Sequence, residues 1–238
     1  MGQGFKSPRA RHADTLRQAN FGAYTSVTEN DVYTNCLKAV EKSKKLTVAD
    51  FSARNFERLD IFAKIAEKTG KQLVVTAKDA YLLHAISCAE GDCLIDKENI
   101  LIYSELKNRK TIKWETEIIM KKWQDHYVSH TQISDNAESY ILCLSLFDMK
   151  HLLDIKPNGG TYIYSSSESF SEEQNVDFVR LGQWLDFFKI EPYGFKIVVK
   201  DKGPEPEFEK GYHASGHASM SDLEHLISEI SARCPEFR

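Results

Sequence analysis

The sequence predicts an α/β fold in which one open, mostly parallel sheet carries helices on both faces, as in Rossmann-like proteins. Short apolar runs at 46–50, 73–76 and 100–103 have the length and continuous apolar character of strands buried on both faces. Helical periodicity fills the segments between these runs. Strands that alternate with helices at this spacing are typical of parallel βαβ units with right-handed connections.

The expected elements follow one another without an internal repeat. The first helix, 31–44, begins after the N-cap chemistry of Thr28–Asp31, and the second, 55–68, is ended by Gly70. The later elements are a helix at 79–89, a mostly helical stretch at 104–139, a strand at 140–145, a helix at 147–155, a strand at 161–165, a helix at 172–188, an edge strand at 195–199 and a helix at 219–232. We expect 1–29 to form an irregular basic N-terminal segment and 30–238 a single α/β domain.

The composition argues against several classes of protein. The chain has 238 residues, of which 42% are hydrophobic and 28% charged, and its formal net charge is −4. No run approaches the roughly 18 apolar residues of a membrane span, and the polar, basic start lacks the apolar core of a secretory signal. Five cysteines without a CxxC pair argue against a disulfide framework and a cysteine-based zinc site. We therefore expect a cytoplasmic protein that does not bind membranes. The net charge argues mildly against non-specific coating of nucleic acid.

Candidate site residues follow the predicted strands, because ligands of open α/β sheets bind outside the carboxyl ends of the strands. Asp50 ends the first strand, and Ser165, Ser166 and Ser167 follow the strand at 161–165. The segment 213–219 reads HASGHAS and leads into the last predicted helix. Helix N-termini attract anions, hydroxyl groups contact phosphate, and a histidine can act as an acid near neutral pH. The pattern therefore indicates a phosphate site.

Each of these features also has a purely structural interpretation. An acid at a strand end caps the following helix, serines form turns, and histidines lie at the rim of a loop that Ser219 caps. Trp114 and Trp123 favour the core over a base-stacking platform. No P-loop, GxGxxG or GxSxG motif supports a complete enzyme of another class, although a small-molecule site at the strand ends would suit the fold.

Four segments together resemble the β-CASP domain of metallo-β-lactamase-fold nucleases, the RNase J group and its archaeal exonuclease relatives. The segment 213–219 resembles the family's HxSGHAS motif, and 46–55 resembles its first acidic motif. The segments 73–83 and 160–168 are similar to a strand-helix unit and to the serine-rich phosphate loop of the archaeal members. These segments occur in the family's order and span roughly 30–232.

The resemblance implies roles for seven residues. His217 would be a catalytic histidine beside the metals and the scissile phosphate, and Asp50 the acid that orients the metal-site shell. The implied RNA-binding residues are His213, Ser215, Ser165, Ser166 and Ser167.

The sequence departs from the family in the metal ligands. Members hold two zinc ions with an HxHxDH motif on the metallo-β-lactamase part, and none of the eight histidines here makes an HxH. Because these ligands are absent, we expect no metal or other cofactor in this chain. The chain also stops at Arg238, before the family's third β-CASP motif, as expected of an inserted domain without its flanking parts. The resulting prediction is the RNA-binding part of a metal-dependent ribonuclease, inactive alone, which clamps single-stranded RNA and cuts with a metallo-β-lactamase domain or partner chain. The alternative is a non-catalytic regulatory paralogue that associates with an intact nuclease, and self-association stays open in both.

Overall fold

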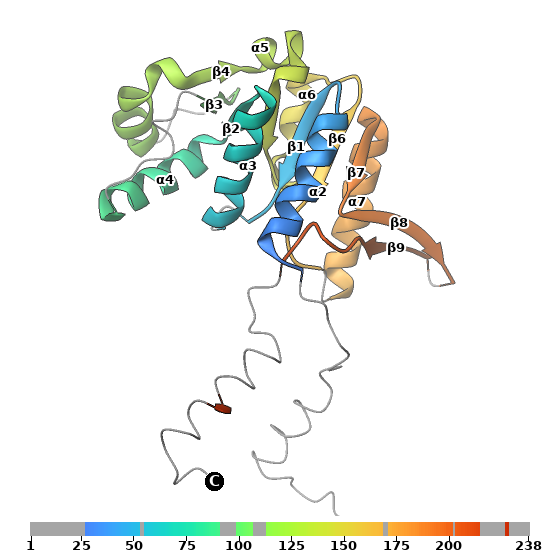
Figure 1. The fold of residues 1–238 in the computed structure, drawn as a ribbon. Coiled ribbons are helices and arrows are strands. Elements are labelled where there is room, and N and C mark those ends of the chain that lie inside the picture. The colour runs from blue at the N-terminus through green and yellow to red at the C-terminus, as the bar shows by residue number, and fades with distance from the viewer. Residues whose placement is uncertain are drawn as a thin grey trace, which may run out of the picture. The chain divides into compact units, whose positions relative to one another are not determined.

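A seven-stranded parallel sheet forms the centre of the protein in the computed structural model (Figure 1). Its strands lie in the order β4-β3-β2-β5-β1-β6-β7. The bounds in chain order are β1 Leu46–Asp50, β2 Gln72–Val75, β3 Ile100–Ser104, β4 Tyr127–Ser129, β5 Tyr140–Cys143, β6 Gly160–Tyr164 and β7 Ile190–Tyr193. The structure describes residues 27–52, 55–90, 99–106, 113–168, 171–201, 203–214 and 227–228. Contacts divide the chain into two units, and the sheet belongs to the unit Val27–Ala214.

Helices cover both faces of the sheet, so the unit has two hydrophobic cores. The α-helices are α2 Glu29–Lys42, α3 Phe56–Thr69, α4 Ala77–Glu90, α5 His130–Asp135, α6 Leu152–Ile155 and α7 Glu172–Phe188. Shorter turns of helix are η2 Glu115–Met120, η3 Gln124–His126, η4 Ala137–Ser139 and η5 Leu146–His151. Side chains of α2, α3, α4 and η2 fill one core, and those of α5, α6 and α7 fill the other. Strand residues alternate between the two cores, as a period of two requires, which Ala49 and Val48 illustrate.

Local sequence signals explain where the helices begin and end. Thr28 and Asp31 form a capping box at the start of α2, because the threonine oxygen accepts from the Asp31 amide while the Asp31 carboxylate accepts from the Thr28 amide. Asn55 caps α3, and Gly70 ends it with a φ of 67°, a left-handed conformation that favours glycine. These caps mark where α2 begins and where α3 begins and ends.

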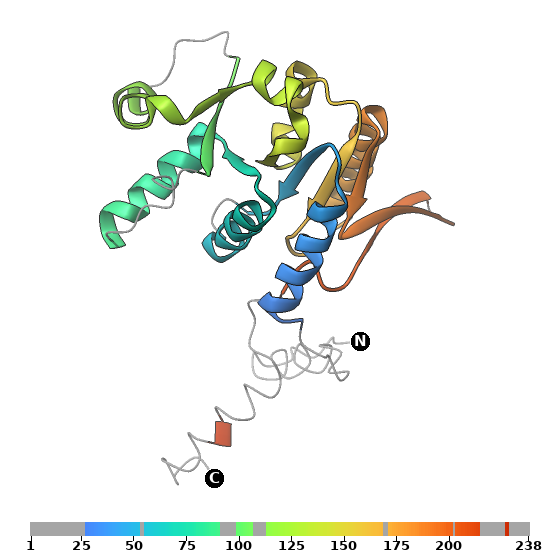
Figure 2. The ribbon, with the colours of Figure 1, turned by 45° about the horizontal axis from the view of Figure 1, so that its top comes forward.

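A two-stranded antiparallel hairpin extends from the side of the sheet where α7 lies (Figure 2). It consists of β8 Phe195–Lys200 and β9 Gly203–Phe208. Phe195 and Phe208 pack against Phe178 of α7, with ring centroids 5.2 and 5.0 Å from that of Phe178. These aromatic contacts hold the hairpin against α7, and Glu209 then leads the chain back toward α2.

The structure confirms the predicted α/β class, and its main differences concern short or edge elements. The stretch 104–139, expected to be mostly helical, contains the edge strand β4, and Ile190–Tyr193 forms the edge strand β7. The strand expected at 195–199 pairs with β9 in a separate sheet, whereas 147–155 is helical but begins as a 3-10 turn. The predicted helix 219–232 lies outside the described residues apart from Ile227 and Ser228, which are helical, and so does the segment 1–26. No helix in the described parts of the chain is long and apolar enough to cross a membrane.

Candidate functional site

A cavity of about 550 Å³ lies at the carboxyl ends of four neighbouring strands, β2, β5, β1 and β6. The chain leaves β1 toward β2 through α3 on one face of the sheet. It leaves β5 toward β6 through η5 and α6 on the other face. The adjacent strands β1 and β5 therefore mark a topological switch point, where ligands of open α/β sheets bind.

Five carboxyl side chains line the cavity, those of Asp50, Asp79, Asp148, Glu168 and Asp177, and the first three accept a hydrogen bond from a nearby hydroxyl group. Asp50 accepts from the Tyr162 hydroxyl, Asp79 accepts from Thr76 at 2.8 Å, and Asp148 accepts from Ser145 at 2.7 Å. The last two contacts are helix-start interactions, because Asp79 lies in the first turn of α4 and Asp148 in that of η5. The cavity therefore presents an acceptor-rich wall.

Burial governs the protonation of two of these carboxyl groups. It raises the pKa of Asp50 to about 7, which the hydrogen bond from Tyr162 opposes and the nearby charge of Asp148 reinforces. Burial likewise raises the pKa of Asp79, against the hydrogen bond from Thr76. Among the described residues that line the cavity, the only basic side chain is Lys78. The interior of this site therefore favours groups that donate hydrogen bonds or carry positive charge over phosphate.

The three predicted serines separate into two environments. Ser166 and Ser167 line the cavity directly after β6, where Ser167 is exposed and its carbonyl oxygen accepts from the Tyr164 hydroxyl at 2.7 Å. Ser165 is fully buried, and its hydroxyl donates to the carbonyl of Tyr212 at 2.5 Å. The hydroxyls that can reach a ligand are therefore those of Ser166 and Ser167, whereas the Ser165 side chain joins two parts of the chain.

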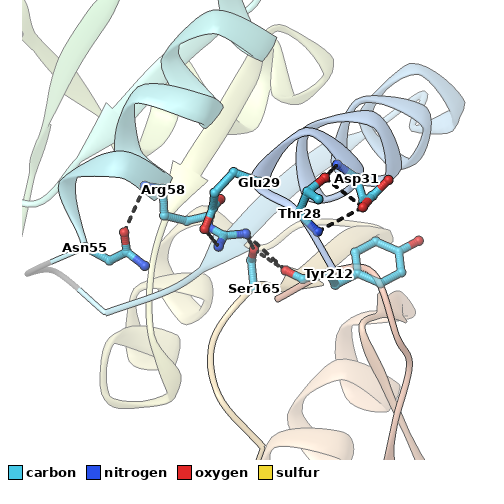
Figure 3. Close-up of polar contacts among 7 residues, drawn as sticks. All are labelled: Thr28, Glu29, Asp31, Asn55, Arg58, Ser165 and Tyr212. Atoms are coloured by element: carbon cyan, nitrogen blue, oxygen red, sulfur yellow. Dashed lines mark hydrogen bonds and ion pairs between the residues drawn. The ribbon is translucent and has the colours of Figure 1, made fainter. Parts of the chain in front are cut away.

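A buried arginine lies beside Ser165 (Figure 3). Arg58, in the first turn of α3, is fully buried, and its guanidinium donates to Ser165 Oγ at 2.8 Å and to the Tyr212 carbonyl at 3.2 Å. It also pairs with Glu29 of α2 at 3.1 Å. The start of α3, the start of α2, the end of β6 and the chain after β9 therefore meet at one guanidinium group.

His213 follows this contact directly and is half-buried. Burial lowers its pKa, and the positive charge of Arg58 lowers it further. The imidazole is therefore neutral at pH 7. Ser215 and His217, the other predicted residues of this segment, lie outside the described residues.

The site contains residues that the sequence did not single out. Arg58 precedes Phe62 by four positions and so lies on the buried face of α3, and an arginine at such a position is a signal for a buried charge network. Asp148 stands three residues after Ser145, which is the spacing of a capping box. Both signals can be read from sequence, but neither identifies the distant partners.

The side chains present do not fit the two-zinc centre of the resembling family. The sequence has no HxHxDH motif. In the described ranges, no three His, Cys, Asp or Glu side chains are grouped so that they could hold a metal ion. We therefore assign no hydrolytic step to a metal held by these residues.

Comparisons with known proteins add little to this geometry. No protein-family model and no curated protein matches the chain. Among solved structures, one similar chain is a nucleotide-binding protein from Archaeoglobus fulgidus, solved in complex with ADP and with cobalt, which is 13% identical with a TM-score of 0.29. The alignment covers 85% of this chain and 83% of that chain. A likeness this small carries no argument about function.

Proposed function

We propose that this chain is the RNA-binding part of a metal-dependent ribonuclease of the β-CASP type, and that it depends on a separate metal-bearing domain or partner for cleavage. The proposal rests on the resemblance of four sequence segments. Its strongest structural support is that Ser165 and Tyr212, far apart in the sequence, are hydrogen-bonded to each other. Ser166 and His213 directly follow these two residues, so both start from the same place in the fold, as a shared phosphate-binding surface requires.

The distribution of charge suggests how an RNA strand would lie. The carboxyl groups that line the cavity repel phosphate from its interior whenever they are ionised. Ser166 and Ser167 supply hydrogen-bonding groups and Lys78 a positive charge among the lining residues, and His213 follows Tyr212, the hydrogen-bond partner of Ser165. The RNA backbone would therefore follow the rim, and such contacts fix position without reading sequence. The protonated or ionised state of Asp50 would then affect groups that enter the cavity.

Binding of single-stranded RNA tests the proposal. Fluorescence anisotropy of a labelled oligoribonucleotide with the 238-residue chain should show weak binding that declines as salt rises. The double variant Ser166→Ala/Ser167→Ala should weaken binding by roughly 10-fold, because two hydrogen-bonding groups are lost. His213→Ala, and Ser215→Ala combined with His217→Ala, should weaken it as well. Ser104→Ala is the matched control, since this exposed serine also ends a parallel strand but lies outside the cavity lining.

A cleavage assay separates the proposal from an active enzyme. The purified chain is incubated with 5′-labelled single-stranded RNA and zinc or manganese, beside His217→Ala. We expect no cleavage without a metal-bearing partner. Cleavage that disappears in His217→Ala would reveal a metal site in the chain, and absence of any RNA binding would refute the proposed function. Recovery of an intact nuclease together with the chain, without RNA binding, would favour the regulatory alternative.

A further inference from the structure

The buried guanidinium of Arg58 has a contact pattern that joins the two proposed RNA-binding segments. One nitrogen, Nη1, donates both to Ser165 Oγ at 2.8 Å and to the Tyr212 carbonyl at 3.2 Å. Ser165 closes the triangle by donating to the same carbonyl at 2.5 Å. Figure 3 shows these groups converging from α3, β6 and the chain after β9. The serine loop, residues 166–168, begins directly after Ser165, and His213 follows Tyr212 directly.

The neighbouring contacts hold the same stretch of chain from α2. Asn35 Nδ2 donates to the Gly211 carbonyl at 3.1 Å, one residue before Tyr212. Glu29 Oε1 binds Arg58 Nη2 at 3.1 Å and supplies the opposite charge. The stretch 211–213 is therefore fixed by side chains of two helices and one strand end. Backbone pairing to the sheet is not what places it, since the parallel sheet ends in sequence at β7.

Stability alone does not explain an arginine at this position. Burial of a guanidinium costs much of what its ion pair gains, and replacement of buried ion pairs by apolar side chains is often neutral or stabilising. A methionine would pack between α2 and α3 without that cost. Only a rigid fork of donors can satisfy Ser165, Tyr212 and Glu29 at once. The feature that the arginine adds is a fixed spacing between segments.

We propose that Arg58 is a positioning residue that sets the serine loop and His213 at one fixed spacing, so that both contact the same RNA backbone. The predicted effect on RNA binding rests on the proposed function, whereas the positioning itself is a property of the folded chain. Arg58 does not touch RNA, because it is fully buried. Its removal should therefore loosen the stretch 209–214 first and weaken RNA binding as a consequence.

The test compares Arg58→Met, Arg58→Lys and Asn35→Ala with Leu185→Ala in the full chain. Leu185 is buried in the core on the opposite face of the sheet and lies outside the cavity lining, so this variant lowers stability without touching the site. Three quantities are measured for each variant: the melting temperature, the hydrogen exchange of the peptide 209–214, and the affinity for single-stranded RNA per folded molecule.

Arg58→Met should speed exchange of 209–214 and weaken RNA binding, each by at least roughly 10-fold, because the loss of even one hydrogen bond to a charged group has about that effect. Exchange in β1 should stay at the wild-type rate. Arg58→Lys keeps the charge but not the fork of donors, so its exchange rate and its RNA affinity should lie between those of the wild type and of Arg58→Met. Asn35→Ala should speed exchange of the same peptide. If Arg58→Met does not fold, Arg58→Lys and Asn35→Ala test the positioning role in its place.

The outcomes separate the inference from the proposed function. Unchanged exchange and unchanged affinity in the Arg58 variants, or both changes reproduced by Leu185→Ala, would overturn the positioning role. If the wild-type chain does not bind RNA, the proposed function fails, and faster exchange of 209–214 confined to the Arg58 and Asn35 variants would still support the positioning of this segment.

Discussion

Asp50 carries a carboxyl group that is buried at the end of β1 and hydrogen-bonded to Tyr162. Its pKa, raised to about 7 mainly by burial, means that the folded protein holds this proton between about pH 4 and pH 7, whereas an unfolded chain has lost it. The folded state therefore binds more protons in this window, and the free energy of unfolding falls as pH rises through it. Above pH 7 the full cost of a buried charge is present.

Substitution of Asp50 by asparagine should remove this cost. We expect Asp50→Asn to raise the free energy of unfolding at pH 8 by roughly 1–4 kcal/mol, with the gain vanishing toward pH 4. Urea unfolding at several pH values measures the difference. Tyr162→Phe is the companion variant: it deletes the hydrogen bond that lowers the pKa of Asp50, so the upper end of the window should move to higher pH. An Asp50→Asn protein less stable than wild type at pH 8 would mean that the carboxylate is well paired.

The pKa of His213 should depend on the charge of Arg58. Burial lowers this pKa first and the guanidinium charge second, so Arg58→Met should raise it part of the way toward 6.5 while the burial contribution persists. A titration of the imidazole signals by NMR measures the shift. Lys64→Met removes an exposed cation from the same helix and serves as the matched control. Equal pKa values in the wild type and Arg58→Met would show that the guanidinium charge does not reach His213.

Sequence reasoning located single residues of the site better than their partners. Asp50 could be predicted because an acid after a buried strand lies at the ligand-binding edge of an open sheet. That Ser165 is buried while Ser166 lines the cavity could not be predicted. The burial of Ser165 depends on Arg58 and Tyr212, which are 107 and 47 positions away. Contacts between segments so far apart leave no local signature in one sequence.

At the scale of elements, the close approach of β6 to β1 depends on Gly160. A Cβ atom at this position would lie 2.3 Å from the carbonyl oxygen of Leu46, its partner in the parallel register. Backbone atoms in a paired sheet cannot move aside as a side chain can. The first residue of β6 must therefore be a glycine for the strands to pair at this register.

Gly160→Ala should lower the free energy of unfolding by roughly 1–3 kcal/mol, the usual cost of overpacking. Gly182→Ala in α7 is the matched control, because its Cβ would meet the Ile197 side chain at 2.8 Å. That side chain can shift, and alanine favours a helix over glycine by about 1 kcal/mol, so this variant should be close to neutral. Urea unfolding compares the two. Equal losses in both variants would contradict the special role of the backbone contact.

The elements that could be predicted are those with long, regular patterns. The helices α2, α3 and α7 and the central strands combine strong periodicity or continuous apolar runs with caps. The missed strands lie at the sheet edges: β4 has three residues inside a tryptophan-containing helical pattern, and β7 contains Pro192. An edge strand needs one partner only, so its sequence carries a weaker signal, and proline is tolerated there.

At the scale of the whole unit, the order of the strands matters more than their number. The βαβ rhythm predicts a parallel sheet, but it leaves open which strand lies beside which. The switch point between β1 and β5 arises only because the chain returns from the β4 edge and inserts β5 between β2 and β1. That return makes the cavity, so the candidate site is a property of topology that no local pattern contains.

The same strand order determines when each strand can find its partner during synthesis. A ribosome releases β1 and β2 early, yet in the described sheet β1 is hydrogen-bonded to β5 and β6 rather than to β2. During synthesis, β1 therefore lacks its partner strand on each edge until Tyr140–Cys143 and Gly160–Tyr164 have emerged. Pairings of such long sequence separation fold slowly and expose apolar strands meanwhile. We therefore expect the first strand to be prone to aggregation until the second half of the chain has been synthesised.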